Sequence, residues 1–315
     1  MVGTPIPSCN TDNKDDGIDE SLNYRQEMRD FVIEISEYAK AVNSDFLIIP
    51  QNGIELISEE NGVINTPYLN AIDANGQESL FYGYNRDNKA TPKSETNRLI
   101  GLLNISQKAG NTILVTDYCS TRSKMSNSYV KNHSNQFVSF SSRERMLNSI
   151  PSYPAPVYAE NNTNIDHISK AKNFLYIINP EKFDSKESFI NAVAATNYDL
   201  IIIDFFFNDS AFNTSDVSRL KVKANGGSRL VVSYLSVGEA EDYRYYWQED
   251  WHSTSPEWMA DENSNWEGNY KVKYWNNDWK SIIYGNENSY LKKILNAGFD
   301  GAYLDIIDAF EYFEE

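Results

Sequence analysis

Acidic side chains follow several apolar runs in this 315-residue chain. Asp204 follows Leu-Ile-Ile-Ile, Asp305 follows Gly-Ala-Tyr-Leu, and Glu239 and Glu241 come just after a run that ends at Ser236. The other members of this group are Glu78, Asp117 and Asp308. Any one of them could be a helix N-cap or a surface acid. Seven acids that converge on one concave face would repel one another, which favours a chemical function for the group as a whole.

Clustered carboxylates serve divalent-metal chemistry and glycoside hydrolysis. The three histidines have no metal-ligand spacing and none follows a predicted strand, so we predict no metal site and no cofactor. Mg²⁺ stays open, because it needs only one or two carboxylates plus substrate phosphates. Glycoside hydrolysis needs one protonated and one ionised acid. It is favoured by aromatic rings beside the carboxylates, which suit stacking on sugar faces, although each ring could instead pack in the outer core. These rings include Tyr82, Tyr118, Tyr234, Trp247 and Trp275.

Apolar runs alternate with helical patterns along the chain. Apolar residues at helical spacing predict helices over 23–42, 93–108 and 278–296. Eight strands are predicted, at 46–50, 68–74, 111–116, 174–178, 198–203, 229–234, 270–274 and 299–304. Region 242–280 is poor in aliphatic residues and is predicted to be a long functional loop with a short strand inside it. Eight strands interleaved with helices favour an α/β fold of the (β/α)8 TIM-like barrel type, with an open doubly wound sheet as the alternative.

Net charge and cysteine usage exclude several classes of protein. Lys and Arg number 28 against 45 Asp and Glu, so the formal charge is 28 − 45 = −17. A chain this acidic lacks the basic face that nucleic-acid binding requires. No apolar run reaches the ~18 residues of a membrane span. Two cysteines without C-x-x-C spacing argue against a disulfide framework or a zinc site. We therefore expect no nucleic-acid partner.

Three segments resemble glycoside hydrolase family 114, and more closely its bacterial and archaeal branch, once described as related to cysteinyl-tRNA synthetase. They are Leu-Val-Val-Ser-Tyr-Leu-Ser-Val-Gly-Glu-Ala-Glu-Asp-Tyr-Arg (230–244), Gly-Phe-Asp-Gly-Ala-Tyr-Leu-Asp-Ile-Ile-Asp (298–308) and Phe-Leu-Ile-Ile-Pro-Gln-Asn-Gly (46–53). The resemblance covers residues 24–158 and 173–315. It implies a TIM-like barrel and an endo-acting hydrolase of an α-1,4-linked galactosaminoglycan, so the expected partner is a polysaccharide or oligosaccharide substrate.

The resemblance also implies roles for individual residues. Asp305 matches the nucleophile or base, and Glu78 the general acid. Glu239 differs from the non-acidic residue of the founding enzymes and marks the branch. Arg244 is expected to pair with a rim carboxylate and keep it ionised. The residues expected to contact substrate are Asp204, Gln51, Asn52, Glu239, Glu241, Arg244, Asp308, Tyr82, Asp117, Tyr118, Trp247 and Trp275.

The order of the segments differs from that of the family. Residues 23–150 resemble the family's C-terminal half and residues 173–315 its N-terminal half, so the single barrel at 23–315 is expected to be a circular permutant. Residues 151–172, with Pro151, Pro154 and Pro156, are expected to be the joining linker. A closed barrel tolerates such a permutation when its ends are neighbours. Residues 304–315 are therefore predicted to lie beside residues 20–31.

Residues 1–22 are predicted to be a flexible tether. Cys9 and the polar, acidic stretch after it resemble the mature start of a bacterial lipoprotein, which implies an extracellular or cell-envelope location and membrane attachment through a lipidated Cys9 alone. No signal segment precedes Cys9, and an incidental cysteine in a frayed N-terminus is the alternative. A monomer is expected. Two other functions stay open, namely a carbohydrate-binding barrel without catalysis and a metal-dependent hydrolase.

Overall fold

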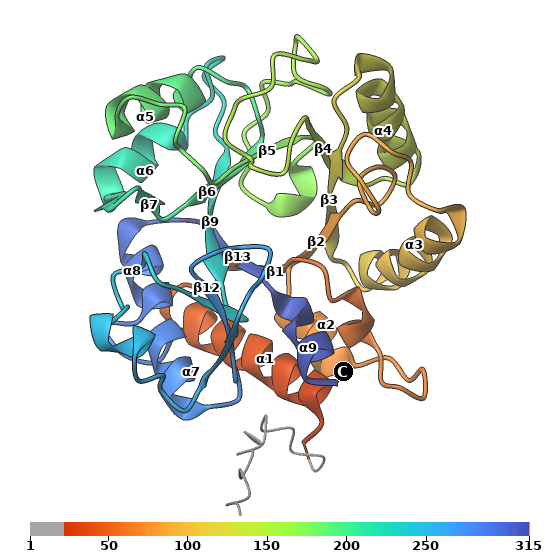
Figure 1. Cartoon of the computed structure of the whole chain (residues 1–315). Coiled ribbons are helices and arrows are strands. Elements are labelled where there is room, and N and C mark those ends of the chain that lie inside the picture. Colours follow the sequence, from red (N-terminus) through yellow and green to blue (C-terminus); the bar gives the residue numbers. More distant parts are fainter. Residues whose placement is uncertain (1–21, 315) are drawn as a thin grey trace, which may run out of the picture.

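The computed structural model describes residues 22–314, in which eight strands form two parallel sheets. The larger sheet has the order β1-β13-β9-β6-β5 and the smaller one the order β2-β3-β4. The strands of the larger sheet are β1 (Leu47–Pro50), β5 (Phe174–Ile177), β6 (Leu200–Asp204), β9 (Leu230–Ser236) and β13 (Gly301–Asp305). Those of the smaller sheet are β2 (Ala74–Glu78), β3 (Thr112–Tyr118) and β4 (Val138–Ser142). The strands lie in the middle of the molecule with helices around them (Figure 1).

The two sheets meet where β1 comes beside β2. Gln51 forms a parallel bridge with Gly76, and the backbone N of Asn52 donates a hydrogen bond of 2.9 Å to the Gly76 carbonyl. Only glycine fits at position 76, because a Cβ there would overlap the Tyr303 hydroxyl. Parallel strands in this order, each joined to the next by helices or loops, are consistent with a TIM-barrel-like fold. The predicted α/β class is therefore confirmed.

Helices cover the strands on the outside. They are α1 (Tyr24–Val42), α2 (Thr66–Ala71), α3 (Lys93–Lys108), α4 (Arg122–Ser134), α5 (Lys186–Ala194), α6 (Thr214–Leu220), α7 (Asn277–Ile283), α8 (Tyr290–Ala297) and α9 (Phe310–Glu314). α1 begins at Asn23, whose side chain accepts a hydrogen bond of 2.9 Å from the backbone N of Gln26. Its buried stripe of Met28, Phe31 and Ile35 is the one predicted from helical spacing. The bounds predicted for α3 are also confirmed.

Several short strands and 3-10 helices lie within the loops. An antiparallel sheet of order β10-β12-β11 is made by β10 (Glu239–Glu241), β11 (Met259–Glu262) and β12 (Asn269–Val272), and β7 (Phe206–Phe207) pairs with β8 (Ser210–Ala211). Short 3-10 helices are η1 (Ile54–Ile57), η2 (Ile168–Lys170), η3 (Glu249–His252) and η4 (Ile307–Ala309). Region 242–280, predicted to be a long loop with one strand, thus contains two strands of this small sheet.

Three predicted elements are wrong. The apolar stretch 68–74 is mostly helix α2, and the strand lies after it, at Ala74–Glu78. The strand predicted at 270–274 exists as β12, but it belongs to the antiparallel sheet, and the eighth parallel strand is the unpredicted β4. The helix predicted over 278–296 is two helices, separated at Gly285 with φ +96°. α7 ends at its C-cap, Tyr284, whose backbone is already extended, with φ −146° and ψ 174°.

The two ends of the described chain lie side by side, as predicted. Arg25 in α1 forms an ion pair of 2.9 Å with Glu314 in α9, and its guanidinium lies 4.4 Å from the centre of the Phe310 ring. The Tyr24 and Phe313 rings have their centres 5.5 Å apart. Figure 1 shows α1 and α9 next to each other. The described ends are therefore close enough to be joined by a short connection.

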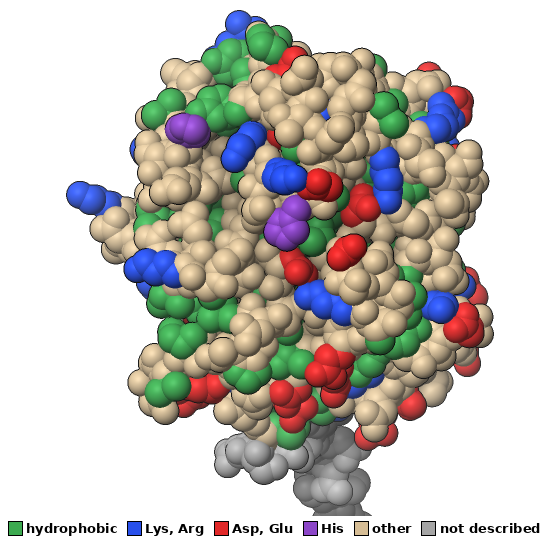
Figure 2. All heavy atoms as spheres, turned by 180° about the vertical axis from the view of Figure 1, so that it is seen from behind, with side chains coloured by type: hydrophobic (Ala, Val, Ile, Leu, Met, Phe, Trp, Pro, Cys, Tyr) green, Lys and Arg blue, Asp and Glu red, His purple; other side chains and the backbone are tan. Residues whose placement is uncertain are grey.

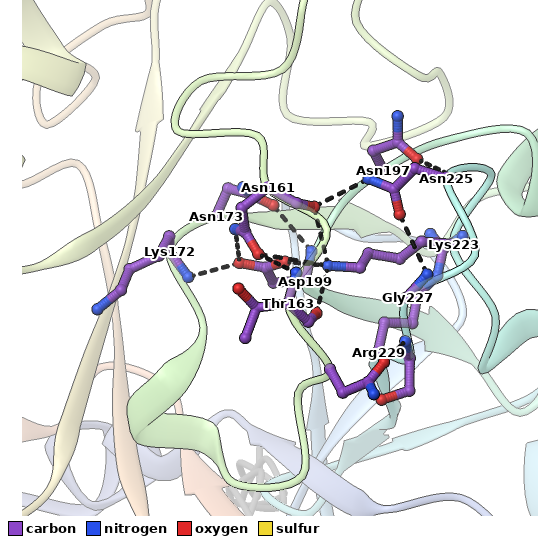
Figure 3. A network of polar contacts seen from close by, with 12 residues as sticks. Asn161, Thr163, Lys172, Asn173, Asn197, Asp199, Lys223, Asn225, Gly227 and Arg229 are labelled. Carbon is purple, nitrogen blue, oxygen red and sulfur yellow. Dashed lines mark hydrogen bonds and ion pairs between the residues drawn. The ribbon is translucent and has the colours of Figure 1, made fainter.

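The segment 151–172 is held by a buried ion pair (Figure 3). The Lys223 ammonium lies 2.9 Å from Asp199, and neither side chain is exposed to solvent. Lys223 also donates to the carbonyls of Asn161 (3.0 Å) and Thr163 (2.8 Å). Asp199 accepts further hydrogen bonds from the Asn161 amide and the backbone N of Lys172. These contacts fasten the segment to the loop before β6 and to the loop before β9.

Charges of both signs lie near the middle of the face behind that of Figure 1 (Figure 2). Among residues 22–314 there is no helix both long and apolar enough to span a membrane. The predictions for Cys9 and the tether fall almost wholly outside the described residues.

Candidate active site

A cavity of about 980 Å³ opens at the carboxyl ends of the parallel strands. Eleven of the residues predicted for the site line it, namely Gln51, Asn52, Glu78, Tyr118, Asp204, Glu239, Glu241, Arg244, Trp247, Asp305 and Asp308. They come from positions at or just after β1, β2, β3, β6, β9, β10 and β13. Because parallel strands end at one edge, residues far apart in the sequence meet there.

Asp305, the last residue of β13, stands at the floor of the cavity. The Tyr234 hydroxyl donates a hydrogen bond of 2.8 Å to its Oδ2. Ile306, directly after it, has the left-handed φ of +60°, so the chain turns sharply where the strand ends. Burial, and then the charge of Glu78, raise the pKa of Asp305 to about 8. This raised pKa favours the protonated form of the carboxyl group at neutral pH.

Glu78, the last residue of β2, is held by residues of β3 and of the loop after β1. The Tyr118 hydroxyl donates a hydrogen bond to Oε1, and the Asn52 amide donates one of 3.4 Å to Oε2. Asn52 Oδ1 also accepts a hydrogen bond of 3.0 Å from the backbone N of Glu78. Both carboxyl oxygens thus accept hydrogen bonds from side chains, which fix the carboxyl group in the cavity.

Arg244 joins two acids of the wall. Its guanidinium contacts both oxygens of Asp204, at 2.9 and 2.7 Å, and both oxygens of Glu241, at 2.5 and 3.1 Å. Burial raises the pKa of Asp204, and the paired guanidinium opposes that effect. The expectation that Arg244 pairs with a rim carboxylate is confirmed. Because both acids share one cation, this cluster keeps a net negative charge.

Glu239 and Asp308 also line the cavity that contains Asp305 and Glu78. Glu239 is nearly fully buried and forms an ion pair of 2.5 Å with Lys271 and a hydrogen bond of 2.8 Å with the Asn263 amide. Asp308 follows β13 in η4, and burial together with Glu311 raises its pKa to about 7. Gln51 accepts a hydrogen bond of 3.1 Å from the Tyr176 hydroxyl, which fixes its side chain at the floor.

Three residues predicted for the site do not line the cavity. Asp117 is fully buried and accepts hydrogen bonds from the backbone N of Phe81 (2.8 Å) and of Tyr82 (3.0 Å), so it organises the loop after Glu78 instead. The Tyr82 hydroxyl donates a hydrogen bond of 2.7 Å to Asn127 in α4. Trp275 packs against Tyr24, with ring centres 5.1 Å apart, and belongs to the contact between the chain ends.

The cavity wall also contains Arg145, Tyr176 and Trp266, which no sequence motif predicted. Arg145 lies on the loop after β4, with its guanidinium 4.3 Å from the centre of the Tyr118 ring. It also donates a hydrogen bond of 2.6 Å to the Gly83 carbonyl. No sequence signal indicated it, because the strand before it, Val-Ser-Phe-Ser-Ser, has no apolar run. Trp266 is 47% exposed, and the richness of its segment in tryptophan was the available signal.

Among residues 22–314 no group of three or more His, Cys, Asp or Glu side chains has a geometry that could hold a metal ion. The acids of the cavity are instead spaced along its wall or paired with Arg244 and Lys271. Carboxyl groups at the ends of β2 and β13 face the cavity, a position that supports acid and base chemistry.

The chain matches the model of glycoside hydrolase family GH114 over residues 157–315, and it belongs to that family. It is 41% identical over 160 residues to an uncharacterized protein of Methanocaldococcus jannaschii, a match that covers 50% of this chain and 42% of that protein. It is 38% identical over 123 residues to an uncharacterized protein of Thermotoga maritima, covering 39% of this chain and 36% of that protein. These matches thus span less than half the length of the relatives. Membership of the family suggests glycosidase activity.

Proposed function

We propose that this protein cleaves an amino-sugar polysaccharide of the α-1,4-galactosaminoglycan type, acting inside the polymer, with Asp305 and Glu78 as its two catalytic carboxyl groups. The observation that carries the proposal is their position. They end β13 and β2 and face the same cavity, and the charge of Glu78 contributes to the raised pKa of Asp305. Glycoside hydrolysis needs one protonated and one ionised carboxyl group on either side of the scissile bond.

The charge of the cavity supports a substrate that carries free amino groups. Ten acids and two arginines line it. One arginine, Arg244, is already paired with two acids, and the other, Arg145, contacts Asp87 at 2.8 Å. A concave surface with this excess of carboxyl groups attracts cations and concentrates them. A polymer of deacetylated, cationic sugars fits this wall better than a neutral one.

The same charge bears on the roles of the two acids. The raised pKa of Asp305 favours its protonated form, whereas a nucleophile or base must be ionised. An ammonium group of the substrate beside Asp305 would lower its pKa and favour the ionised form. Binding of a cationic sugar would thereby prepare Asp305 for the role of nucleophile or base, with Glu78 as the general acid. Asp204, Glu241, Glu239 and Trp247 would contact the sugars.

We also propose that the eight parallel strands close into one (β/α)8 barrel whose two halves have exchanged order. Three observations support this. The family model matches only residues 157–315, the described chain ends are joined by the pair Arg25–Glu314, and β1 is bridged to β2. A polymer-degrading enzyme acts where its polymer lies, so we propose an extracellular or cell-envelope location, with Cys9 as the point of lipid attachment, and action as a monomer.

The test is incubation of the protein with partially and fully deacetylated galactosamine polymers, followed by measurement of product sizes. Asp305→Asn and Glu78→Gln should each lower kcat by about 10²-fold to 10⁴-fold. The matched control is Glu257→Gln, an exposed acid outside the cavity that should keep full activity. Circular dichroism should show that all three variants fold. Activity of Asp305→Asn equal to that of the control would reject the assignment.

Two further outcomes separate the alternatives. Binding of the polymer without any hydrolysis would show a carbohydrate-binding protein that lacks catalysis. Loss of hydrolysis after dialysis against a chelator would show a metal-dependent hydrolase, because two-carboxylate catalysis requires no metal ion.

A further inference from the structure

A second cavity, of about 260 Å³, continues from the larger one on the side of Glu78. The two cavities share Asn52, Glu78, Arg145 and Asp308 as lining residues, so Glu78 stands where they meet. Pockets that enclose a whole small-molecule ligand occupy about 300–1,000 Å³. The second cavity therefore has room for one ring of a longer molecule that also fills the first.

Among the described residues, two acids of the second cavity, Asp308 and Glu311, have no direct ion-pair partner. Arg98, which lies in the same wall, already forms ion pairs with Glu95, at 2.6 Å, and with Glu55. In the described part of the chain, no side chain donates a hydrogen bond to the carboxyl group of Asp308 or of Glu311, and neither forms an ion pair. Glu311 is also a cause of the raised pKa of Asp308, so the two acids share a negative potential. A ligand cation between them would relieve that repulsion.

Gln77 and Tyr84, which also line the second cavity, favour a sugar as its ligand. Gln77 is 6% exposed, and its Oε1 has no hydrogen-bond partner among the described residues. Its Nε2 is already used, donating at 3.0 Å to the carbonyl of Glu78. A buried acceptor without a partner is unfavourable, and a hydroxyl donor would satisfy it. Tyr84, 53% exposed, offers a ring on which an apolar sugar face can stack.

We propose that this second cavity is a subsite for one amino-sugar ring of the polymer, on the opposite side of the scissile bond from the larger cavity. The ammonium group would lie between Asp308 and Glu311, a hydroxyl would donate to Gln77, and the ring would stack on Tyr84. The proposal rests on the proposed function, because it assumes a polymer of amino sugars. Rings bound in both cavities place the scissile bond beside Glu78, where the two cavities meet.

The test compares Glu311→Gln with Glu37→Gln, an exposed helical glutamate that lines neither cavity. The probe is a hexamer of α-1,4-linked galactosamine, with its fully N-acetylated form as the uncharged counterpart. Loss of one partly exposed ion pair corresponds to about twofold to fivefold in affinity. Glu311→Gln should raise KM for the galactosamine hexamer by that factor with kcat unchanged, and should shift the cleavage position. Glu37→Gln should do neither, and the acetylated hexamer should not distinguish the two variants.

A binding measurement decides the proposal independently of activity. In the Asp305→Asn background, calorimetry with the galactosamine hexamer should give the same twofold to fivefold increase in Kd for Glu311→Gln. If the wild-type protein hydrolyses no amino-sugar polymer, the proposed function fails, and this Kd comparison still tests the subsite. Equal Kd values for Glu311→Gln and Glu37→Gln, or no binding of the hexamer at all, would overturn the subsite.

Discussion

Replacement of Tyr234 by phenylalanine should raise the pKa of Asp305. The Tyr234 hydroxyl donates a hydrogen bond of 2.8 Å to Oδ2, and a donor to a carboxylate favours its ionised form. A hydrogen bond to a charged group contributes about 1.5–3 kcal/mol, and one pKa unit corresponds to about 1.36 kcal/mol. Tyr234→Phe should therefore raise the pKa of Asp305 by about one to two units, from the value of about 8 that burial and Glu78 produce.

The assay is a pH titration of carboxyl ¹³C chemical shifts in protein labelled at aspartate, in which the spectrum of Asp305→Asn identifies the resonance. The matched control is Tyr243→Phe, because Tyr243 donates to Glu241 at 2.6 Å instead of to Asp305. It removes a phenol from the same cavity and should leave the midpoint of Asp305 within a few tenths of a unit. An unchanged or lowered midpoint in Tyr234→Phe would refute the reasoning about the hydrogen bond. A wild-type midpoint near 4 would refute the effect of burial.

Three further predictions concern stability and chain order. Because the folded-state pKa of Asp305, about 8, lies above the unfolded value of about 4, the folded protein binds more protons in this window and loses stability as pH rises through it. Asp305→Asn should flatten that decline in urea unfolding between pH 5 and 8, and an unchanged slope would contradict the prediction. Lys223→Met should lower the free energy of unfolding by about 3–5 kcal/mol because it leaves Asp199 buried without its cation, whereas Lys221→Met, at a surface pair, should cost about 0–1 kcal/mol. A chain that joins residue 314 to residue 24 by a short linker and opens within 151–157 should fold with the same circular dichroism spectrum, and an unfolded product would count against the proposed permutation.

Elements with a strong local pattern could be predicted from the sequence. α1 and α3 are long and amphipathic, so the spacing of their apolar residues was sufficient. β2 and β4 were not recognisable, because their sequences, Ala-Asn-Gly-Gln-Glu and Val-Ser-Phe-Ser-Ser, are mostly polar. Their burial depends on partners elsewhere in the chain, such as the Tyr303 hydroxyl that occupies the space beside Gly76. Tertiary contacts overrode local propensity at these strands.

The candidate site was predictable where a residue ends a recognisable strand. Asp305 and Asp204 follow apolar runs, so their place at the carboxyl ends of strands followed from the pattern, and the family resemblance supplied Glu78. Asp117 also ends a strand, but its side chain turns to the backbone of the following loop, which no spacing reveals. Arg145 reaches the cavity because β4 pairs with β3, and the sequence pattern did not indicate this pairing. The direction of a side chain, and its contacts with loops distant in the sequence, are set only in the folded chain.

The two proposed catalytic acids, Asp305 and Glu78, come from different sheets. Asp305 belongs to the five-stranded sheet and Glu78 to the three-stranded sheet. Beside that pair, the sheets are connected by the bridge between Gln51 and Gly76 and by the hydrogen bond from Asn52 to Gly76. Asn52 donates to the Gly76 carbonyl at this contact and also to the Glu78 carboxyl group, so the position of Glu78 depends on how the two sheets meet.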